Sequence, residues 1–267
     1  MAKKRLDELL VEKNLAVDVD KAKRLVMAGL VFSEQLRLDK PGMKLDETIP
    51  LRVKTKNPYV GRGGLKMEKA LKYFSLTATG KTFMDIGSST GGFTDCALQH
   101  GARLSYAIDV GYNQLDWTLR NDDRVVVMER TNFRHVTEDM LKQGKPDLAA
   151  IDVSFISLEL ILPVLKQLLK ENSDVIALIK PQFEARKEEV GERGIVRDKD
   201  VHRSVLNKTL QFAKNEGFEV CDLTHSPITG SEGNLEFLAY LTWKTVSPHC
   251  KQVEVQKIVD RAHAELS

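Results

Sequence analysis

The sequence has few cysteines and no segment that predicts export or a membrane span. Its three cysteines, Cys96, Cys221 and Cys250, form no Cys-x-x-Cys pair, so we expect free thiols and neither a disulfide framework nor a metal site. The first residues, Met-Ala-Lys-Lys-Arg, are not followed by the apolar region of a signal peptide. No run of 18 apolar residues occurs, because Asp152 and Glu159 interrupt the most apolar region. We therefore expect a cytoplasmic protein without a membrane-spanning helix.

Two common phosphate-binding patterns are missing from a glycine-rich turn of the chain. The turn follows an apolar strand predicted at 82–86 and reads Gly-Ser-Ser-Thr-Gly-Gly-Phe over 87–93. It contains neither Gly-Lys-Ser/Thr nor Gly-x-Gly-x-x-Gly, which argues against a Walker A loop and against a dehydrogenase. Its small residues would still let the backbone approach a ligand, and the next helix offers free N–H groups. An ordinary glycine-rich turn between strand and helix is the alternative.

Two carboxylates near this turn favour a ligand that carries an amine but no phosphate. Asp85 lies near the tip of the strand, and Asp109 follows 24 residues later, at the end of the strand predicted at 104–109. An acidic residue at about this spacing binds a ribose hydroxyl in nucleotide-type Rossmann folds. S-adenosylmethionine carries an amine and a ribose and has no phosphate. The predicted cofactor-binding residues are Asp85, Gly87, Ser88, Ser89, Thr90, Gly91, Gly92, Phe93, Asp109 and Asp152.

The net charge of +2 conceals an uneven distribution along the chain. Residues 1–72 hold 17 Lys and Arg against 10 Asp and Glu, a net charge of +7, and the remainder holds 23 against 28, a net charge of −5. A basic N-terminal segment on an acidic body indicates that the N-terminal part contacts a polyanion. The alternative is a solvated basic surface.

From residue 81 onward, predicted strands and helices alternate. The strands are expected at 82–86, 104–109, 124–128, 147–152, 174–180, 218–224 and 236–243, with helices between them, notably at 157–170 and 199–216. This alternation predicts a doubly wound parallel sheet. The last two strands are joined by a loop without a helix, so the final strand should pair antiparallel, as in the seven-stranded methyltransferase variant of the Rossmann fold. We expect a linker at 54–65 and an amphipathic helix within 249–266.

The N-terminal segment predicts two short helices within 5–30, followed by strands at 30–32 and 49–53. Several of its motifs resemble the S4 RNA-binding domain: Arg5-Leu6-Asp7, Arg24-Leu25-Val26, Gly29-Leu30-Val31, Lys40-Pro41-Gly42 and Ile49-Pro50-Leu51-Arg52-Val53. The resemblance implies a small α+β domain that contacts RNA phosphates, which position a protein without reading sequence. The expected RNA-binding residues are Lys3, Lys4, Arg5, Lys21, Lys23, Arg24 and Arg62.

Two lysines and two acids are expected at one edge of the sheet. Asp152 and Lys180 end predicted strands, Glu236 opens the antiparallel strand, and Lys66 begins a helix after the turn at 61–64. Ligands of open α/β sheets bind outside the carboxyl ends of the strands, so the four side chains should converge there. A lysine acts as a base only when burial or a second cation lowers its pKa from about 10.4. We expect Lys180 to be the base, Lys66 the second cation, and the two acids to orient both amines; isolated ion pairs are the alternative.

This Lys-Asp-Lys-Glu set resembles that of the FtsJ-like RNA 2′-O-methyltransferases, and with an S4 domain in front the chain resembles the TlyA family. The shared segments include Asp85 to Thr94, Ala107-Ile108-Asp109-Val110-Gly111, Asp152-Val153-Ser154-Phe155 and Lys180-Pro181-Gln182-Phe183-Glu184. The resemblance covers nearly the whole chain. It implies an S4-like domain with linker over 1–59 and a Rossmann-like methyltransferase domain over 60–267. It also implies S-adenosylmethionine as cofactor and a cytidine 2′-hydroxyl of ribosomal RNA as target, with no DNA partner.

Other functions remain to be weighed. Members of the TlyA family often carry the name hemolysin, which would imply a membrane-active protein, but the sequence shows no span and no strongly amphipathic cationic helix. A non-catalytic RNA-binding factor that holds the cofactor as a ligand is a further alternative. The presence of the expected residue type at all four expected reactive positions argues against it.

Overall fold

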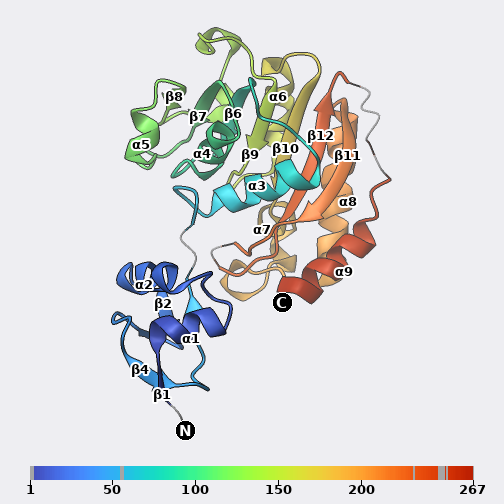
Figure 1. Cartoon of the computed structure of the whole chain (residues 1–267). Coiled ribbons are helices and arrows are strands. Elements are labelled where there is room, and N and C mark those ends of the chain that lie inside the picture. Colours follow the sequence, from blue (N-terminus) through green and yellow to red (C-terminus); the bar gives the residue numbers. More distant parts are fainter. Residues whose placement is uncertain (1–2, 55–56, 231, 246–249, 251, 267) are drawn as a thin grey trace. The chain divides into compact units, whose positions relative to one another are not determined.

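The computed structural model of the chain describes residues 3–54, 57–230, 232–245, 250 and 252–266. The chain divides into two compact units, Met1–Pro58 and Tyr59–Ser267. Figure 1 shows the elements of both units. Each unit has a hydrophobic core of its own, so each is described by itself.

The first unit is small and mixes helices with short strands. Its elements are β1 (Lys3–Arg5), α1 (Leu6–Glu12), α2 (Val19–Met27), β2 (Val31–Ser33), β3 (Leu36–Arg37), β4 (Lys44–Asp46) and β5 (Arg52–Val53). β1 pairs with β4, and β2 lies between β3 and β5. The Asp18 carboxylate accepts a hydrogen bond from the Lys21 N–H and so caps α2. Apolar residues of α1, α2 and β2 form the core, which confirms the two predicted helices.

The second unit is built on a sheet that the described residues form from seven strands. They are β6 (Thr82–Ile86), β7 (Leu104–Ile108), β8 (Val125–Met128), β9 (Leu148–Ile151), β10 (Ser173–Ile179), β11 (Phe218–His225) and β12 (Phe237–Trp243). Their order is β11-β12-β10-β9-β6-β7-β8. β12 runs antiparallel to both of its neighbours, whereas β6 to β10 pair in parallel. The predicted seven-stranded Rossmann-like methyltransferase sheet is therefore confirmed.

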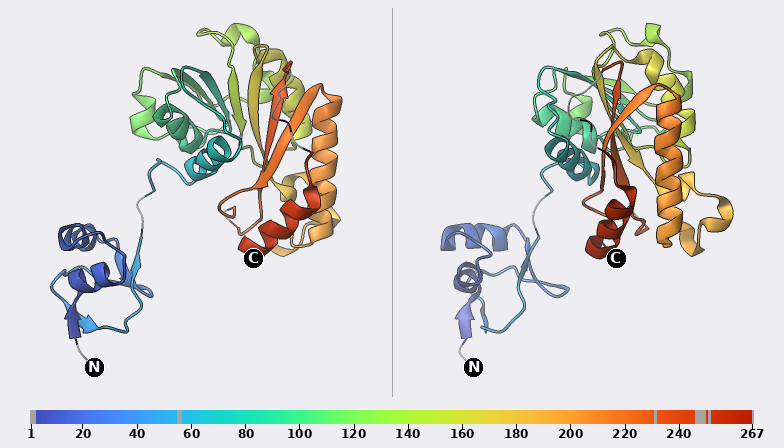
Figure 2. Two further views of the ribbon diagram at one scale, coloured as in Figure 1. Left: turned by 45° about the vertical axis from the view of Figure 1, so that its right-hand side comes forward. Right: turned by 90° about the vertical axis from the view of Figure 1, so that its right-hand side faces the viewer.

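Helices cover both faces of this sheet, as the right-hand view of Figure 2 shows. On one face, α3 (Gly63–Tyr73) and α4 (Gly92–Gln99) pack on β6 residues such as Phe83. On the other, α6 (Leu162–Leu168), α8 (Lys199–Asn215) and α9 (Val255–Leu266) belong to the core cluster that includes Met84 and Ile86, and α8 and α9 lie against β11. Because alternate residues of a strand point to opposite faces, every residue of β6 is buried. The shorter helices are α5 (Trp117–Arg120) and α7 (Pro181–Glu184).

The strand order creates a crevice beside β6. The chain leaves β6 towards β7 on one side, while β9 pairs with β6 on the other side. Connections that diverge from neighbouring parallel strands leave an opening at the carboxyl ends of those strands. The turn after β6 and the segment after β9 therefore border the same opening.

Most predicted strands differ from the structure by one residue at one or both ends, and the strand expected at 49–53 is shortened to β5. Three longer segments differ as well. The linker expected at 54–65 is too long, because α3 already begins at Gly63. The helix expected at 157–170 is a 3₁₀ turn at Leu158–Leu160 followed by α6 from Leu162. Pro163 accounts for this, since proline is tolerated in the first turn of a helix but not in its interior. The C-terminal helix begins at Val255, and residues 249 and 251 of its expected range lie outside the described residues.

The expectation of three free thiols is wrong for two of them. Cys221 on β11 and Cys250 after β12 form a disulfide, whereas Cys96 is free and buried. The two sulfurs meet because β11 and β12 are adjacent strands, a proximity that spacing along the sequence does not reveal. With Glu219 they place three possible metal-ligand atoms within 4.8 Å of one another. Metals bind cysteine as the thiolate, and the two sulfurs of a disulfide are not thiolates. The absence of a metal stays a prediction.

No helix within the described parts of the chain has the length and apolar character needed to cross a membrane.

Candidate active site

The glycine-rich turn after β6 lies directly against the end of β9. Gly87 and Gly91 have φ angles of 87° and 92°, which residues with a side chain rarely adopt. A Cβ atom on Gly87 would lie 2.9 Å from the carbonyl carbon of Asp152 and closer still to its oxygen. The two strand ends can therefore approach each other only because residue 87 has no side chain.

The carboxylate of Asp85 is buried beneath this turn, with 1% of its surface exposed. Its Oδ2 accepts hydrogen bonds from the backbone N–H of Thr94 (2.9 Å) and from its hydroxyl (2.7 Å). Its Oδ1 is buried and has no hydrogen-bond partner among the described residues. Burial raises the pKa of Asp85 to about 7, and the charges of Asp152 and Asp109 act in the same direction. A cationic group beside the free oxygen would stabilise this carboxylate.

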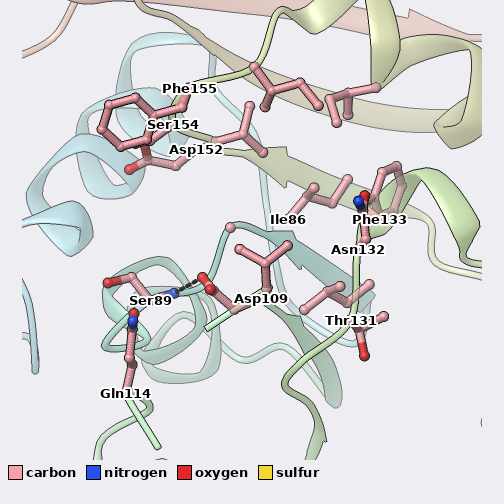
Figure 3. Close-up of a pocket in the computed structure, with 16 residues that line it drawn as sticks. Ile86, Ser89, Asp109, Gln114, Thr131, Asn132, Phe133, Asp152, Ser154 and Phe155 are labelled. Atoms are coloured by element: carbon pink, nitrogen blue, oxygen red, sulfur yellow. Dashed lines mark hydrogen bonds between the residues drawn. The ribbon is translucent and has the colours of Figure 1, made fainter. Parts of the chain in front are cut away.

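A cavity of about 350 Å³ opens beside the turn, within the usual size of small-molecule sites. Figure 3 shows Ile86 and Asp109 between two walls, one containing Asp152 and Phe155 and the other Thr131, Asn132 and Phe133. The lining residues are Ile86, Gly87, Ser89, Ile108, Asp109, Val110, Gln114, Thr131, Asn132, Phe133, Asp152, Val153, Ser154, Phe155, Ile156 and Ile161.

Asp109 is held by backbone donors at one end of this cavity. Its Oδ2 accepts from the Ser89 N–H at 2.8 Å, drawn as a dashed line in Figure 3. Its Oδ1 accepts from the Gly111 N–H at 2.7 Å. The two bonds fix the carboxylate, and each oxygen keeps a lone pair that can accept a further donor, such as a ribose hydroxyl.

Four charged side chains meet where β9, β10, β12 and α3 come together. The Lys180 Nζ lies 2.6 Å from Asp152 Oδ1, and the Lys66 Nζ lies 2.6 Å from Glu236 Oε2 and 3.7 Å from Asp152 Oδ2. Lys66 and Lys180 are each 8% exposed and Glu236 is 3% exposed. Charged groups are seldom buried unless they are paired, and here two positive and two negative groups compensate one another. Asp152 is shared by both lysines.

Close backbone contacts bring Lys66 to this point. A Cβ on Gly63 would lie 3.0 Å from the Phe93 ring, and one on Gly92 would lie 2.8 Å from the Gly64 nitrogen. The first turn of α3 therefore packs directly on the backbone of Gly92 and on the Phe93 ring. The Val60 N–H donates to the Asp95 carboxylate at 2.8 Å and ties the segment before α3 to α4.

Glu236 is positioned by the loop between β11 and β12. A Cβ on Gly230 would lie 2.7 Å from Glu236 Oε1, so glycine at this position leaves room for the carboxylate. The Arg62 guanidinium donates to the Thr229 carbonyl at 2.8 Å, and the Asn234 side chain bonds the Val196 N–H and the Gly194 carbonyl. These contacts hold the loop from two sides.

The structure divides the sequence-predicted cofactor residues into two groups. Gly87, Ser89, Asp109 and Asp152 line the cavity. The remaining six do not line it: Asp85 is buried beneath the turn, and the others belong to the turn and the start of α4, namely Ser88, Thr90, Gly91, Gly92 and Phe93. The sequence argument missed the wall formed by 131–133, which follows β8 in an irregular segment and carries no recognisable motif.

Several residues expected to contact RNA pair with acids of their own unit. The Lys4 Nζ lies 2.9 Å from Glu12, and the Arg5 guanidinium lies 2.7 Å from Asp7. Lys23 pairs with Asp20 at 3.5 Å, and the Arg24 Nε donates to the Asp20 carbonyl at 3.3 Å. Lys3 and Lys21 are exposed. The RNA-binding role of these residues stays a prediction.

Comparison with known proteins finds relatives along the whole chain. The family model described as "FtsJ-like methyltransferase" matches residues 59–243. The "Putative rRNA methyltransferase YqxC" of Bacillus subtilis is 56% identical over 99% of this chain and 95% of that protein. The "16S/23S rRNA (cytidine-2'-O)-methyltransferase TlyA" of Mycobacterium tuberculosis is 39% identical over 90% of each chain. A solved structure, "Putative hemolysin from Streptococcus thermophilus", superposes with a TM-score of 0.76 at 49% identity, covering 99% of this chain and 97% of that one.

Proposed function

Since the chain belongs to the FtsJ-like methyltransferase family, we propose that it transfers a methyl group from S-adenosylmethionine to a ribose 2′-hydroxyl of ribosomal RNA. The observation that carries the proposal is the buried group of Lys66, Asp152, Lys180 and Glu236 at the edge of the cavity. The names of two relatives support ribosomal RNA as the substrate, and one of these names supports a cytidine. We place the protein in the cytoplasm, where ribosomal RNA is found.

The residues around the cavity fit the proposed cofactor. Asp85 lies beneath the turn and outside the cavity lining, and its Oδ1, which has no hydrogen-bond partner among the described residues, suits a nearby group that carries positive charge. The Asp109 carboxylate, which lines the cavity, suits ribose hydroxyls. Ile86, Ile108 and Phe133 offer apolar surface to a flat ring. When bound, S-adenosylmethionine supplies an electrophilic methyl group on a sulfonium.

Lys180 is our candidate for the base that accepts the proton of the ribose hydroxyl. Its amine is held by Asp152 at 2.6 Å and donates to the Ser154 hydroxyl at 3.0 Å. A lysine can accept a proton only when its amine is neutral. The Lys66 ammonium shares the Asp152 carboxylate with Lys180 and is itself fixed by Glu236. The ribose oxygen that loses its proton to Lys180 would then take the methyl group.

An exposed aromatic surface beside the cavity supports a nucleic acid as the substrate. The Phe155 side chain is 90% exposed, and its ring centroid lies 5.0 Å from that of Phe183. An adjoining hollow is lined by these two rings and by Arg134. Stacking of a base on an aromatic side chain contributes about 1–3 kcal/mol, and an arginine can contact phosphate. We propose that the target nucleotide approaches over Phe155.

We further propose that residues 1–59 form an S4-like RNA-binding domain with its linker and that 60–267 form the methyltransferase domain. The positive charge of the N-terminal segment supports this. In that arrangement Lys3, Lys4, Arg5, Lys21, Lys23, Arg24 and Arg62 contribute phosphate contacts.

The test replaces the candidate base. Removing a general base typically lowers a rate by about 10²–10⁴-fold, so Lys180→Ala should lose at least that much transfer to ribosomal RNA while its affinity for S-adenosylmethionine changes little. Lys180→Arg should fail as well, because guanidinium does not deprotonate. The exposed Lys257→Arg is the matched control. Transfer is measured by mass spectrometry of nucleosides after incubation with labelled cofactor, and affinity by calorimetry.

Two results would contradict the proposal. Near-normal turnover of Lys180→Arg would mean that residue 180 acts as a fixed cation and not as a base. Absence of any 2′-O-methylated nucleoside in ribosomal RNA treated with the unaltered protein, despite cofactor binding, would favour a non-catalytic RNA-binding factor.

A further inference from the structure

The segment that carries Phe155 is fastened at both ends to the residues that follow β10. Near its first end, Lys180 bonds Asp152 and the Ser154 hydroxyl. At its second end, the Ser157 hydroxyl donates to Glu184 Oε2 at 2.6 Å, and the Leu158 N–H donates to Glu184 Oε1 at 2.8 Å. Both carboxylate oxygens of Glu184 are therefore used to hold this one segment.

Glu184 stands one helical turn after Lys180, at the end of α7. Burial raises the pKa of Glu184, and the bonds from Ser157 and Leu158 oppose that shift by favouring the carboxylate. A carboxylate withdrawn from water needs compensating donors. The two donors found here both come from the segment after β9, so removing Glu184 would release that segment while leaving β9 and β10 paired.

Phe155 is in a conformation that needs such support. Its φ angle is 62°, in the left-handed region that is unfavourable for a bulky residue. Its ring is also exposed to solvent. A strained backbone and an exposed aromatic ring persist only where the surrounding structure enforces them, and such sites are often functional. The fastening by Lys180 on one side and Glu184 on the other is what enforces the conformation here.

We propose that Glu184 is a positioning residue that fixes the Phe155 segment for the RNA substrate. It acts through Ser157 and Leu158 and does not touch the reacting atoms. This inference rests on the proposed function, because it assumes that the RNA approaches over Phe155. The residues that follow β10 would then have two functions. Lys180 acts as the base in the reaction, and Glu184 positions the segment over which the nucleotide enters.

The experiment compares Glu184→Ala with Glu184→Gln in the full chain. Losing hydrogen bonds to a charged group typically weakens an interaction by about 10–100-fold. We expect Glu184→Ala to lower kcat/KM for ribosomal RNA by about that factor, mainly through a higher KM. Its Kd for S-adenosylmethionine should stay within about twofold of the unaltered protein. Glu184→Gln should recover part of the loss, because the amide oxygen can still accept from Leu158 and the amide N–H can donate to Ser157.

The exposed Glu188→Ala, four residues further along, is the matched control and should behave as the unaltered protein. Ser157→Ala is the milder variant if Glu184→Ala folds poorly, and it should give a smaller loss of the same kind. Combined with Glu184→Ala it should add little, because two residues acting through one contact are not additive.

The outcomes separate this inference from the proposed function. If the unaltered protein does not methylate ribosomal RNA, the proposed function fails. If it does so and the Glu184 and Ser157 variants match Glu188→Ala, the inference is overturned. It is also overturned if Glu184→Ala weakens cofactor binding as much as RNA binding, since that would indicate general loss of structure.

Discussion

Replacing Gly87 by alanine tests how the two strand ends form the site. A Cβ at this position would lie 2.9 Å from the Asp152 carbonyl carbon and 3.2 Å from the Val153 nitrogen, and both are backbone atoms. The turn or the end of β9 must therefore move by several tenths of an ångström. Alanine also has to adopt a φ angle of 87°, which costs about 1–2 kcal/mol for a residue with a Cβ. Overpacking of this kind costs about 1–3 kcal/mol more.

Gly144→Ala separates the two costs. Gly144 has a φ angle of 93°, and nothing lies within 4 Å of its Cβ position. Gly144→Ala should lower the free energy of unfolding only by the conformational cost, about 1–2 kcal/mol. Gly87→Ala should lower it by about 2–5 kcal/mol. In a unit of this size, the difference lowers Tm by about 2–12 °C more for Gly87→Ala. Chemical denaturation of both variants measures the free energies of unfolding.

Gly87→Ala should also impair the reaction out of proportion to its stability. A shift of the Asp152 backbone displaces the carboxylate that holds both lysines, and misplacement by about 1 Å can cost about 100-fold in rate. Methyl transfer is measured at a temperature where both glycine variants are folded. Equal stability and equal turnover of Gly87→Ala and Gly144→Ala would refute the argument that backbone contact at residue 87 sets the geometry.

Three further predictions concern the cofactor, the first unit and pH. Asp109→Ala should weaken S-adenosylmethionine binding by about 1–3 kcal/mol in calorimetry, the usual cost of a hydrogen bond to a charged group. Removing residues 1–58 should abolish methylation of ribosomal RNA but leave cofactor affinity within about twofold. RNA binding by the full chain should weaken steeply with salt in a filter-binding assay. Burial, with the charge of His263, lowers the pKa of His202 to about 4. At His202 the unfolded chain therefore takes up a proton below about pH 6.5 while the native protein does not, a contribution of up to about 3 kcal/mol against stability as the pH falls towards 4. The native Asp85 carboxyl, with its pKa of about 7, takes up a proton over the same range and acts in the opposite direction, so the His202 contribution is measured as the difference in unfolding free energy between the unaltered protein and His202→Gln at pH 7.5 and 5.

The sheet could be predicted from the sequence because its strands are buried on both faces. The strand at 82–86 is apolar apart from Thr82 and Asp85 and is followed by turn residues, and the predicted range agrees with β6 at both ends. Once the strands are placed, the site follows, because parallel strands bring their carboxyl ends to one edge. This is why Lys66, Asp152, Lys180 and Glu236, far apart in sequence, could be expected together.

Features that depend on contacts between distant segments could not be predicted. The short strands β1, β3 and β4 have two or three residues each, too few to show an alternating pattern. The cavity wall at 131–133 and the bonds from Glu184 to Ser157 and Leu158 become visible only when separate loops are placed side by side. The start of α3 at Gly63 could not be predicted from the sequence, because glycine usually indicates a turn and not the first residue of a helix.

The unpartnered oxygen of Asp85 couples proton balance to ligand binding. With a pKa of about 7, this carboxyl is partly protonated near neutral pH, whereas an adjacent ammonium group of a bound ligand would favour the ionised form. Binding would then release a fraction of a proton, and the affinity would rise with pH until the carboxyl is fully ionised. The heat measured for cofactor binding would vary with the ionisation enthalpy of the buffer, although the proposed base is Lys180 and not Asp85.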